Sequence, residues 1–222
     1  MRAFLLCLLA LLVTAASARY QEKNLKWKGP KAVADIDYVR FSPNTPLTRY
    51  ANSIIEVKAR NLLAMFKKEA KAPMTSSGID MSVGCVVHTD LPNLISVHFS
   101  IDSYLGGAHP NVEFATYTFG IVDGKPATLK LKDVASDRRE MLSLLTKAIR
   151  QELKDSDIDP SAFSPEDAGF ASESFVVSKS EIEFLYDGFG HAIGARTGSV
   201  KWNSIRSLKR NGPLAALFRA HK

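Results

Sequence analysis

Histidine and cysteine side chains are the groups of this 222-residue sequence best suited to nucleophilic, acid–base or metal chemistry. The histidines are His88, His98, His109, His191 and His221, and beyond the N-terminal apolar run the sequence has one cysteine, Cys85. No two histidines have the H-x-x-x-H or H-x-x-E-H spacing of helical zinc sites, and the sequence has no G-x-S-x-G nucleophile turn. We therefore expect a protein without catalytic residues, metal ligands or a cofactor.

Cys85 itself is expected to be buried rather than reactive. It follows Met81 and Val83 and precedes Val87 at alternate positions, which is the pattern of an inward-facing residue of a β-strand. A buried thiol behaves as a small apolar side chain.

A possible calcium loop begins at Asp155, with acidic residues at its positions 1, 3, 5 and 12. Position six of such a loop needs a glycine, because the chain turns sharply there. This sequence has Pro160 at that position, and proline fixes φ near −65°. We therefore expect these acids to lie in a solvated loop and not to bind calcium.

His109 stands in the most distinctive stretch, an alternating strand that runs into a glycine pair. The expected core face of this strand is Val97, Phe99 and Ile101, and the expected solvent face is His98, Ser100 and Asp102. Gly106 and Gly107 allow backbone angles that a side chain would forbid, so a sharp corner is predicted. His109 either contacts a ligand at this corner or caps a backbone carbonyl, and the residues alone leave both interpretations open.

Residues 1–18 are predicted to be a secretory signal peptide. They combine a positive start at Arg2, an apolar run over 3–13 and the small-residue site Ala16-Ser17-Ala18. Cleavage is expected between Ala18 and Arg19, and the cysteine of this segment lies within the apolar run, so no lipid anchor is expected. No later stretch is apolar enough to span a membrane. The mature protein is therefore expected in the periplasm or outside the cell.

The remaining sequence predicts a single α+β domain over residues 32–222, preceded by a basic, mobile arm over 19–31. Strands are expected at 32–41, 79–88, 93–102, 111–122, 175–177, 181–186 and 199–202. Helices are expected at 48–71, from 136–137 to about 153, and briefly around 214–218. The predicted architecture is an antiparallel sheet, made of a meander plus later strands, packed against two helices.

Charge is distributed unevenly along this domain. Residues 19–222 carry 28 Lys and Arg against 23 Asp and Glu. Residues 152–187 hold ten acids and two bases, whereas residues 188–222 hold seven bases and no acid. In an exported protein this basic tail favours an anionic envelope polymer or lipid headgroups over nucleic acid, because no nucleic-acid motif accompanies it. A merely solvated terminus is the alternative.

The stretch Tyr104-Leu105-Gly106-Gly107-Ala108-His109, followed by a strand, the turn 123–125 and Leu129-Lys130-Leu131-Lys132-Asp133, resembles the RsiV-type extracytoplasmic domain of unknown function. That domain occurs in lysozyme-sensing anti-sigma factors and beside the catalytic domain of PdaC-type peptidoglycan deacetylases. The resemblance extends to a late turn between two strands, where Gly198 matches the family pattern but its tyrosines and glutamate have no counterpart.

The resemblance implies an exported, non-enzymatic binding domain that acts at the bacterial cell envelope, with an anionic envelope polymer or peptidoglycan as its ligand. The candidate ligand-binding residues are Tyr104, Gly106, Gly107, His109, Asn111, His191 and Arg196. A second hypothesis is a binder or inhibitor of lysozyme-like muramidases, which are commonly basic and would have to dock on the acidic 152–187 segment. A peptidoglycan-modifying enzyme is the third.

Overall fold

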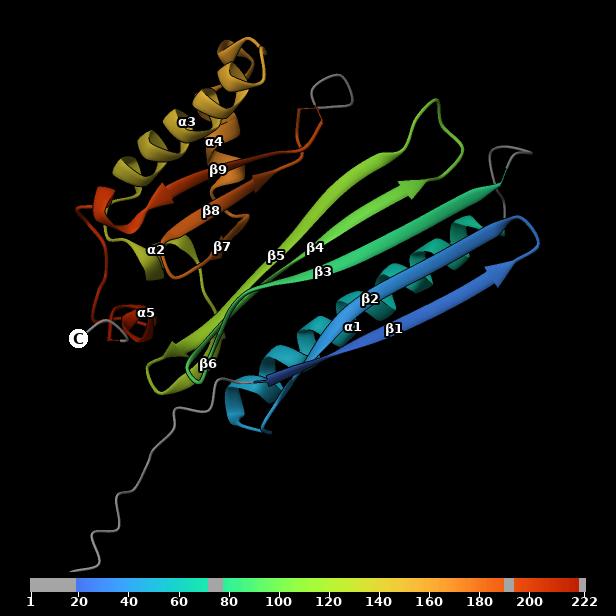
Figure 1. Cartoon of the computed structure of the whole chain (residues 1–222), viewed down its shortest axis with the longest axis horizontal. Coiled ribbons are helices and arrows are strands. Elements are labelled where there is room, and N and C mark those ends of the chain that lie inside the picture. The colour runs from blue at the N-terminus through green and yellow to red at the C-terminus, as the bar shows by residue number, and fades with distance from the viewer. Residues whose placement is uncertain (1–18, 72–77, 190–193, 220–222) are drawn as a thin grey trace, which may run out of the picture.

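The computed structural model describes residues 19–71, 78–189 and 194–219, which form a six-stranded and a three-stranded sheet with helices on their outer sides (Figure 1). The strands are β1 (Arg19–Gly29), β2 (Ala32–Ser42), β3 (Ile79–Leu91), β4 (Leu94–Tyr104), β5 (Asn111–Val122), β6 (Lys125–Thr128), β7 (Phe175–Val177), β8 (Glu181–Tyr186) and β9 (Arg196–Lys201). The helices are α1 (Pro46–Glu69), α2 (Leu131–Val134), α3 (Arg138–Asp155), α4 (Pro165–Ala171) and α5 (Ala215–Arg219), with 3₁₀ turns η1 (Pro160–Ala162) and η2 (Trp202–Ser204). The α+β class is confirmed, but the strands form two sheets rather than one.

The predicted mobile arm is wrong, because residues 19–29 form the edge strand β1. This strand pairs antiparallel with β2 along its whole length, from Arg19 opposite Ser42 to Gly29 opposite Ala32. Trp27 is partly buried beside α1, where its ring meets Phe66 edge-on with centroids 6.0 Å apart. Alternating lysines on the exposed side of β1 hid this inward-facing pattern in the sequence.

Helix α1 covers one face of the six-stranded sheet and connects two neighbouring strands of it (Figure 1). Because the chain crosses the sheet through α1, β2 and β3 run parallel, while the other neighbouring strands of this sheet are antiparallel. Thr45 caps the helix by accepting a hydrogen bond from the Thr48 amide. The predicted apolar stripe of α1 is buried: Ala51, Ile55, Ala59, Leu62 and Phe66.

The two faces of β4 differ from the expectation of one core face and one solvent face. Val97, Phe99 and Ile101 are buried beneath α1, as predicted. The opposite face is also covered at one end, where Ser96 is fully buried and His98 is half-buried. The strand β7 lies over this end of β4 and β5, so a second layer excludes the water that the sequence pattern led us to expect.

Hydroxyl groups of the large sheet satisfy the backbone of β7. The Val177 amide donates to Ser96 Oγ over 2.9 Å, and Thr89 Oγ1 donates to the Val177 carbonyl. Thr118 Oγ1 donates to the Phe175 carbonyl over 3.3 Å and shares a 2.8 Å hydrogen bond with Ser96. Buried backbone groups need partners, and here side chains on the face of one sheet supply them to the edge of another.

The three-stranded sheet, of order β7-β8-β9, carries α3 and α4 on its other side (Figure 1). The close contact between β9 and α3 explains why position 198 is a glycine, the one that matched the family pattern in the sequence. A methyl group at this position would lie 2.6 Å from the Ile149 side chain of α3. Gly198 therefore serves the packing of helix on strand.

We expect Ser96→Ala to lower the free energy of unfolding by about 1–3 kcal/mol, because the buried Val177 amide would lose its acceptor. Urea unfolding followed by circular dichroism measures this loss. Ser100→Ala on the same face of β4, where the side chain is half-buried, is the matched control and should change the value by less than about 0.5 kcal/mol. Equal effects of the two substitutions would contradict the role given to Ser96.

Candidate functional site

Five of the seven predicted site residues lie together in the β4–β5 hairpin, at one end of the large sheet. Ser103 pairs with Asn111, and residues 105–110 form the loop between the strands. Gly106 has a φ of 98°, a conformation that side-chain-bearing residues rarely adopt. Gly107 has no comparable restriction, because an added methyl group would meet only the His109 carbonyl oxygen at 3.8 Å. The sharp corner predicted for the glycine pair therefore depends on Gly106.

The side chains at this corner differ in their exposure and in their partners. His109 is exposed, and the Asn111 amide donates to Glu113 over 2.9 Å. Tyr104 is half-buried and lies beside a hollow of about 480 Å³ at the same end of the sheet. Of the predicted residues that the structure describes, only Tyr104 lines this hollow.

The hollow follows a row of residues across four neighbouring strands. Lys28 of β1 lies opposite Val33, Val33 lies beside Asp80 of β3, and Asp80 lies opposite Tyr104 of β4. Lys31, in the turn between β1 and β2, adds a second cation to the lining. The sequence could not reveal this group, because β1 was expected to be an arm and the parallel pairing of β2 with β3 has no local signature. The result is an open concave site with one aromatic ring, two cations and one carboxylate, that of Asp80.

Arg196 does not belong to this site. It begins β9 opposite Tyr186, and its Nε lies 3.7 Å from Glu152 Oε2 of α3. This ion pair links β9 to α3, so Arg196 has a structural role. His191 lies outside the described residues.

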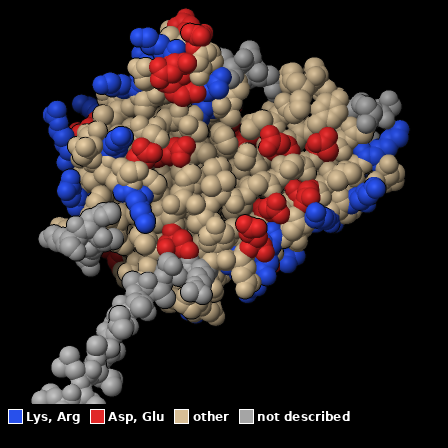
Figure 2. Space-filling model, in the orientation of Figure 1, with Lys and Arg blue, Asp and Glu red and all other residues tan. Residues whose placement is uncertain are grey.

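The face of the large sheet opposite α1 is acidic (Figure 2). Asp35 of β2 lies beside Ser82 of β3, and Ser82 lies opposite Asp102 of β4. Asp37 and Asp80 are exposed on neighbouring rows. A hydrogen bond from Asn24, and then one from Lys26, lowers the pKa of the Asp35 carboxyl. Acidic residues of this protein are thus exposed on β2, β3 and β4 as well as in the segment 152–187, where the sequence had shown an excess of acids.

Two histidines meet between the two sheets, where the sequence had predicted a solvent-facing His98. His88 Nε2 and His98 Nδ1 are 2.7 Å apart, and His98 stacks edge-on against Phe114. Glu183 of β8 approaches from the other sheet, with its Oε2 3.7 Å from His88 Nδ1. One ring donates this hydrogen bond and the other accepts it, an arrangement that two protonated rings cannot make.

Burial controls the charge of this histidine pair. It lowers the pKa of His98 to about 4, with a further contribution from His88, and it lowers the pKa of His88 as well. Burial raises the pKa of Glu183 and brings that of Asp90 to about 6. Because their pKa values are lowered, the two histidines make the folded state less stable as the pH falls below neutral. The pKa values of the two carboxyls are raised, so these groups make the folded state less stable as the pH rises. Among the described residues, no three His, Cys, Asp or Glu side chains gather as a metal site.

The Cys85 thiol is a poor nucleophile in this fold. Its side chain is half-buried against the core beneath α1, and burial raises its pKa to about 12. The thiolate required for reaction is therefore scarce at neutral pH.

We expect the pH dependence of stability to weaken in His98→Gln. The folded-state pKa of His98 lies below its ordinary value of 6.5, so its stabilisation is present above pH 6.5 and is lost as the pH falls towards 4. Partial exposure reduces this loss to the order of 2 kcal/mol. Urea unfolding at several pH values, compared with wild type, separates this effect from those of Asp90 and Glu183. The same pH dependence of the free energy of unfolding in His98→Gln and in wild type would contradict this role of His98.

Comparison with known proteins places the fold. No protein-family model and no curated protein sequence matches the chain. A DUF3298 family protein from Pseudomonas aeruginosa PAO1 superimposes with a TM-score of 0.62 at 14% identity, covering 87% of this chain and 95% of that one. A DUF3298 family member from Bacteroides fragilis gives 0.58 at 14% identity, covering 90% and 98%. The chain therefore has the fold of these two DUF3298 structures, a domain of unknown function.

Proposed function

We propose that this protein is an exported, non-enzymatic domain of the RsiV type that binds an anionic polymer or peptidoglycan at the bacterial cell envelope. The observation that carries the proposal is the hollow beside Tyr104, where two cations, Lys28 and Lys31, outnumber the one lining carboxylate, Asp80. Peptidoglycan presents sugar rings and carboxylates. An aromatic face suits the first, and ammonium groups suit the second.

The N-terminal sequence and the shared fold support this proposal. The signal-peptide pattern of residues 1–18 favours export of the mature domain. No helix among the described residues is long and apolar enough to cross a membrane. The fold shared with two DUF3298 proteins is compatible with the RsiV-type resemblance of the hairpin residues.

Co-sedimentation with purified cell-wall sacculi tests the proposal. We expect Lys28→Gln combined with Tyr104→Ala to weaken retention about tenfold or more, because one ionic contact and one ring contact are lost. Lys68→Gln on the exposed side of α1 removes one charge away from the hollow and should retain binding. Unchanged retention of the double variant on sacculi would exclude the hollow as the binding site. Turnover of wall fragments by the wild-type protein would instead favour an enzyme.

A lysozyme-like muramidase is the second candidate partner, and the acidic sheet face favours it. Lysozymes are commonly basic, and Asp35 and Asp102 lie in one row on a face that α1 leaves uncovered. Charge complementarity would allow this face to attract a basic protein even though the whole chain is basic.

A pull-down with lysozyme at low and high salt separates this candidate from the first. We expect Asp35→Asn combined with Asp102→Asn to reduce capture severalfold, and capture by wild type to fall as salt screens the charges. Asp155→Asn combined with Asp157→Asn removes two exposed acids of the 152–187 segment as the matched control. A larger loss of lysozyme capture in the control pair would show that lysozyme docks on the 152–187 segment instead.

A further inference from the structure

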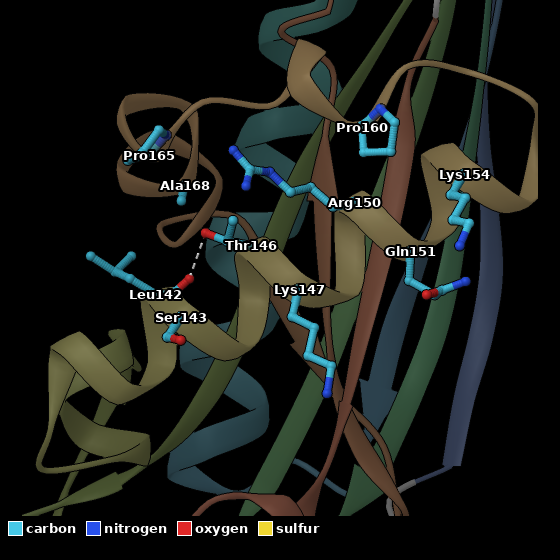
Figure 3. A pocket seen from close by; sticks show the side chains of 10 residues that line it. All are labelled: Leu142, Ser143, Thr146, Lys147, Arg150, Gln151, Lys154, Pro160, Pro165 and Ala168. Carbon is cyan, nitrogen blue, oxygen red and sulfur yellow. Dashed lines mark hydrogen bonds between the residues drawn. The ribbon is translucent and has the colours of Figure 1, made fainter.

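A second hollow, separate from the one beside Tyr104, lies along α3 and has a volume of about 620 Å³ (Figure 3). Its floor is the exposed side of α3, and its far wall is built from η1 and the start of α4, through Pro160 and Pro165. Lys147, Arg150 and Lys154 contribute to the lining, and none of the ten lining residues is acidic. The hollow is therefore a groove with three cations.

The cations follow one another along the helix. Lys147, Arg150 and Lys154 are three and four residues apart, so each is a neighbour of the next on the helix surface, with Cβ atoms about 5–6 Å apart. Ser143 and Gln151 stand beside them on the same side of α3 (Figure 3). A ligand lying along the groove would meet three positive charges and the polar side chains of Ser143 and Gln151.

Arg150 is held in place by the fold. Its Nε and one terminal nitrogen both donate to the Phe163 carbonyl, over 3.1 and 2.9 Å. A guanidinium has five N–H donors, so three remain for another partner. Because these bonds already fix the planar group, an anion would meet an oriented donor rather than a mobile one.

Nearby acids do not neutralise the lysines of the groove. In the part of the chain that the structure describes, neither Lys147 nor Lys154 has a carboxylate within 4.0 Å. Three surrounding carboxylates accept hydrogen bonds from other groups: Asp155 from Gln151, Asp159 from the Ser161 amide, and Asp167 from Ser164 and Tyr186. The positive charge of the groove is thus available to a ligand.

We propose that this groove binds a linear polyanion, a chain molecule with repeated phosphate or carboxylate groups. The walls formed by η1 and α4 suit a narrow chain better than a flat membrane surface, and the row of charges suits repeated anions better than a single one. This site does not rest on the function proposed for the Tyr104 hollow, since the two share no lining residue.

Fluorescence anisotropy with labelled linear inorganic polyphosphate tests the proposal on the mature chain. We expect Lys147→Gln combined with Lys154→Gln to weaken binding about fivefold to tenfold, because two exposed ionic contacts are lost. Lys68→Gln in α1 combined with Lys71→Gln in the turn after it removes the same charge from exposed positions elsewhere and should change affinity less than about twofold. Both pairs are at exposed sites, so the melting temperature serves as a check on folding.

Three results would overturn the proposal. Equal weakening by both pairs would mean that polyphosphate responds to net charge alone. Lack of binding by the wild-type chain would mean that the groove has no affinity for repeated phosphates. Binding to phosphatidylglycerol vesicles that depends on Lys147 and Lys154, without binding to polyphosphate, would assign the groove to lipid headgroups instead.

Discussion

The hydrogen bonds between β7 and the hydroxyls of the large sheet are the constraint on which the two-layer arrangement depends. An edge strand placed on the face of another sheet has no ladder partner on that side, and burying its backbone unpaired would cost several kcal/mol. Ser96, Thr89 and Thr118 remove this cost. The same contact encloses the His88–His98 pair, so the geometry of the interface also determines the charge state of its histidines.

Local periodicity was enough to predict most elements of this fold. Strands β5, β7 and β8 have the predicted bounds, and α1 buries its predicted stripe. What the sequence could not supply were the pairings between distant segments. The parallel contact of β2 with β3, the cover that β7 gives to Ser96 and the incorporation of β1 all depend on residues far apart in the chain.

The candidate sites show the same division. The hairpin from Tyr104 to Asn111 was visible in the sequence because its residues are contiguous. Lys28 could not be joined to Tyr104 without knowing the register across four strands. Arg196 looked like a ligand residue beside an irregular turn, yet a helix from another part of the chain supplies its partner, Glu152. Electrostatic surfaces were hardest to foresee, since the acidic sheet face draws single aspartates from separate strands.

The order of the two cores along the chain has a consequence for how the protein is made. The core beneath α1 uses residues from Ala32 to Phe119, whereas the other core uses Leu94 and then residues from Leu129 onward. The residues of the large sheet therefore precede most of those of the second core along the chain. A three-residue strand such as β7 is too short to be stable alone, and it acquires its position only when those hydroxyls are already in place. This order of the cores would allow the first layer to act as a template for the second.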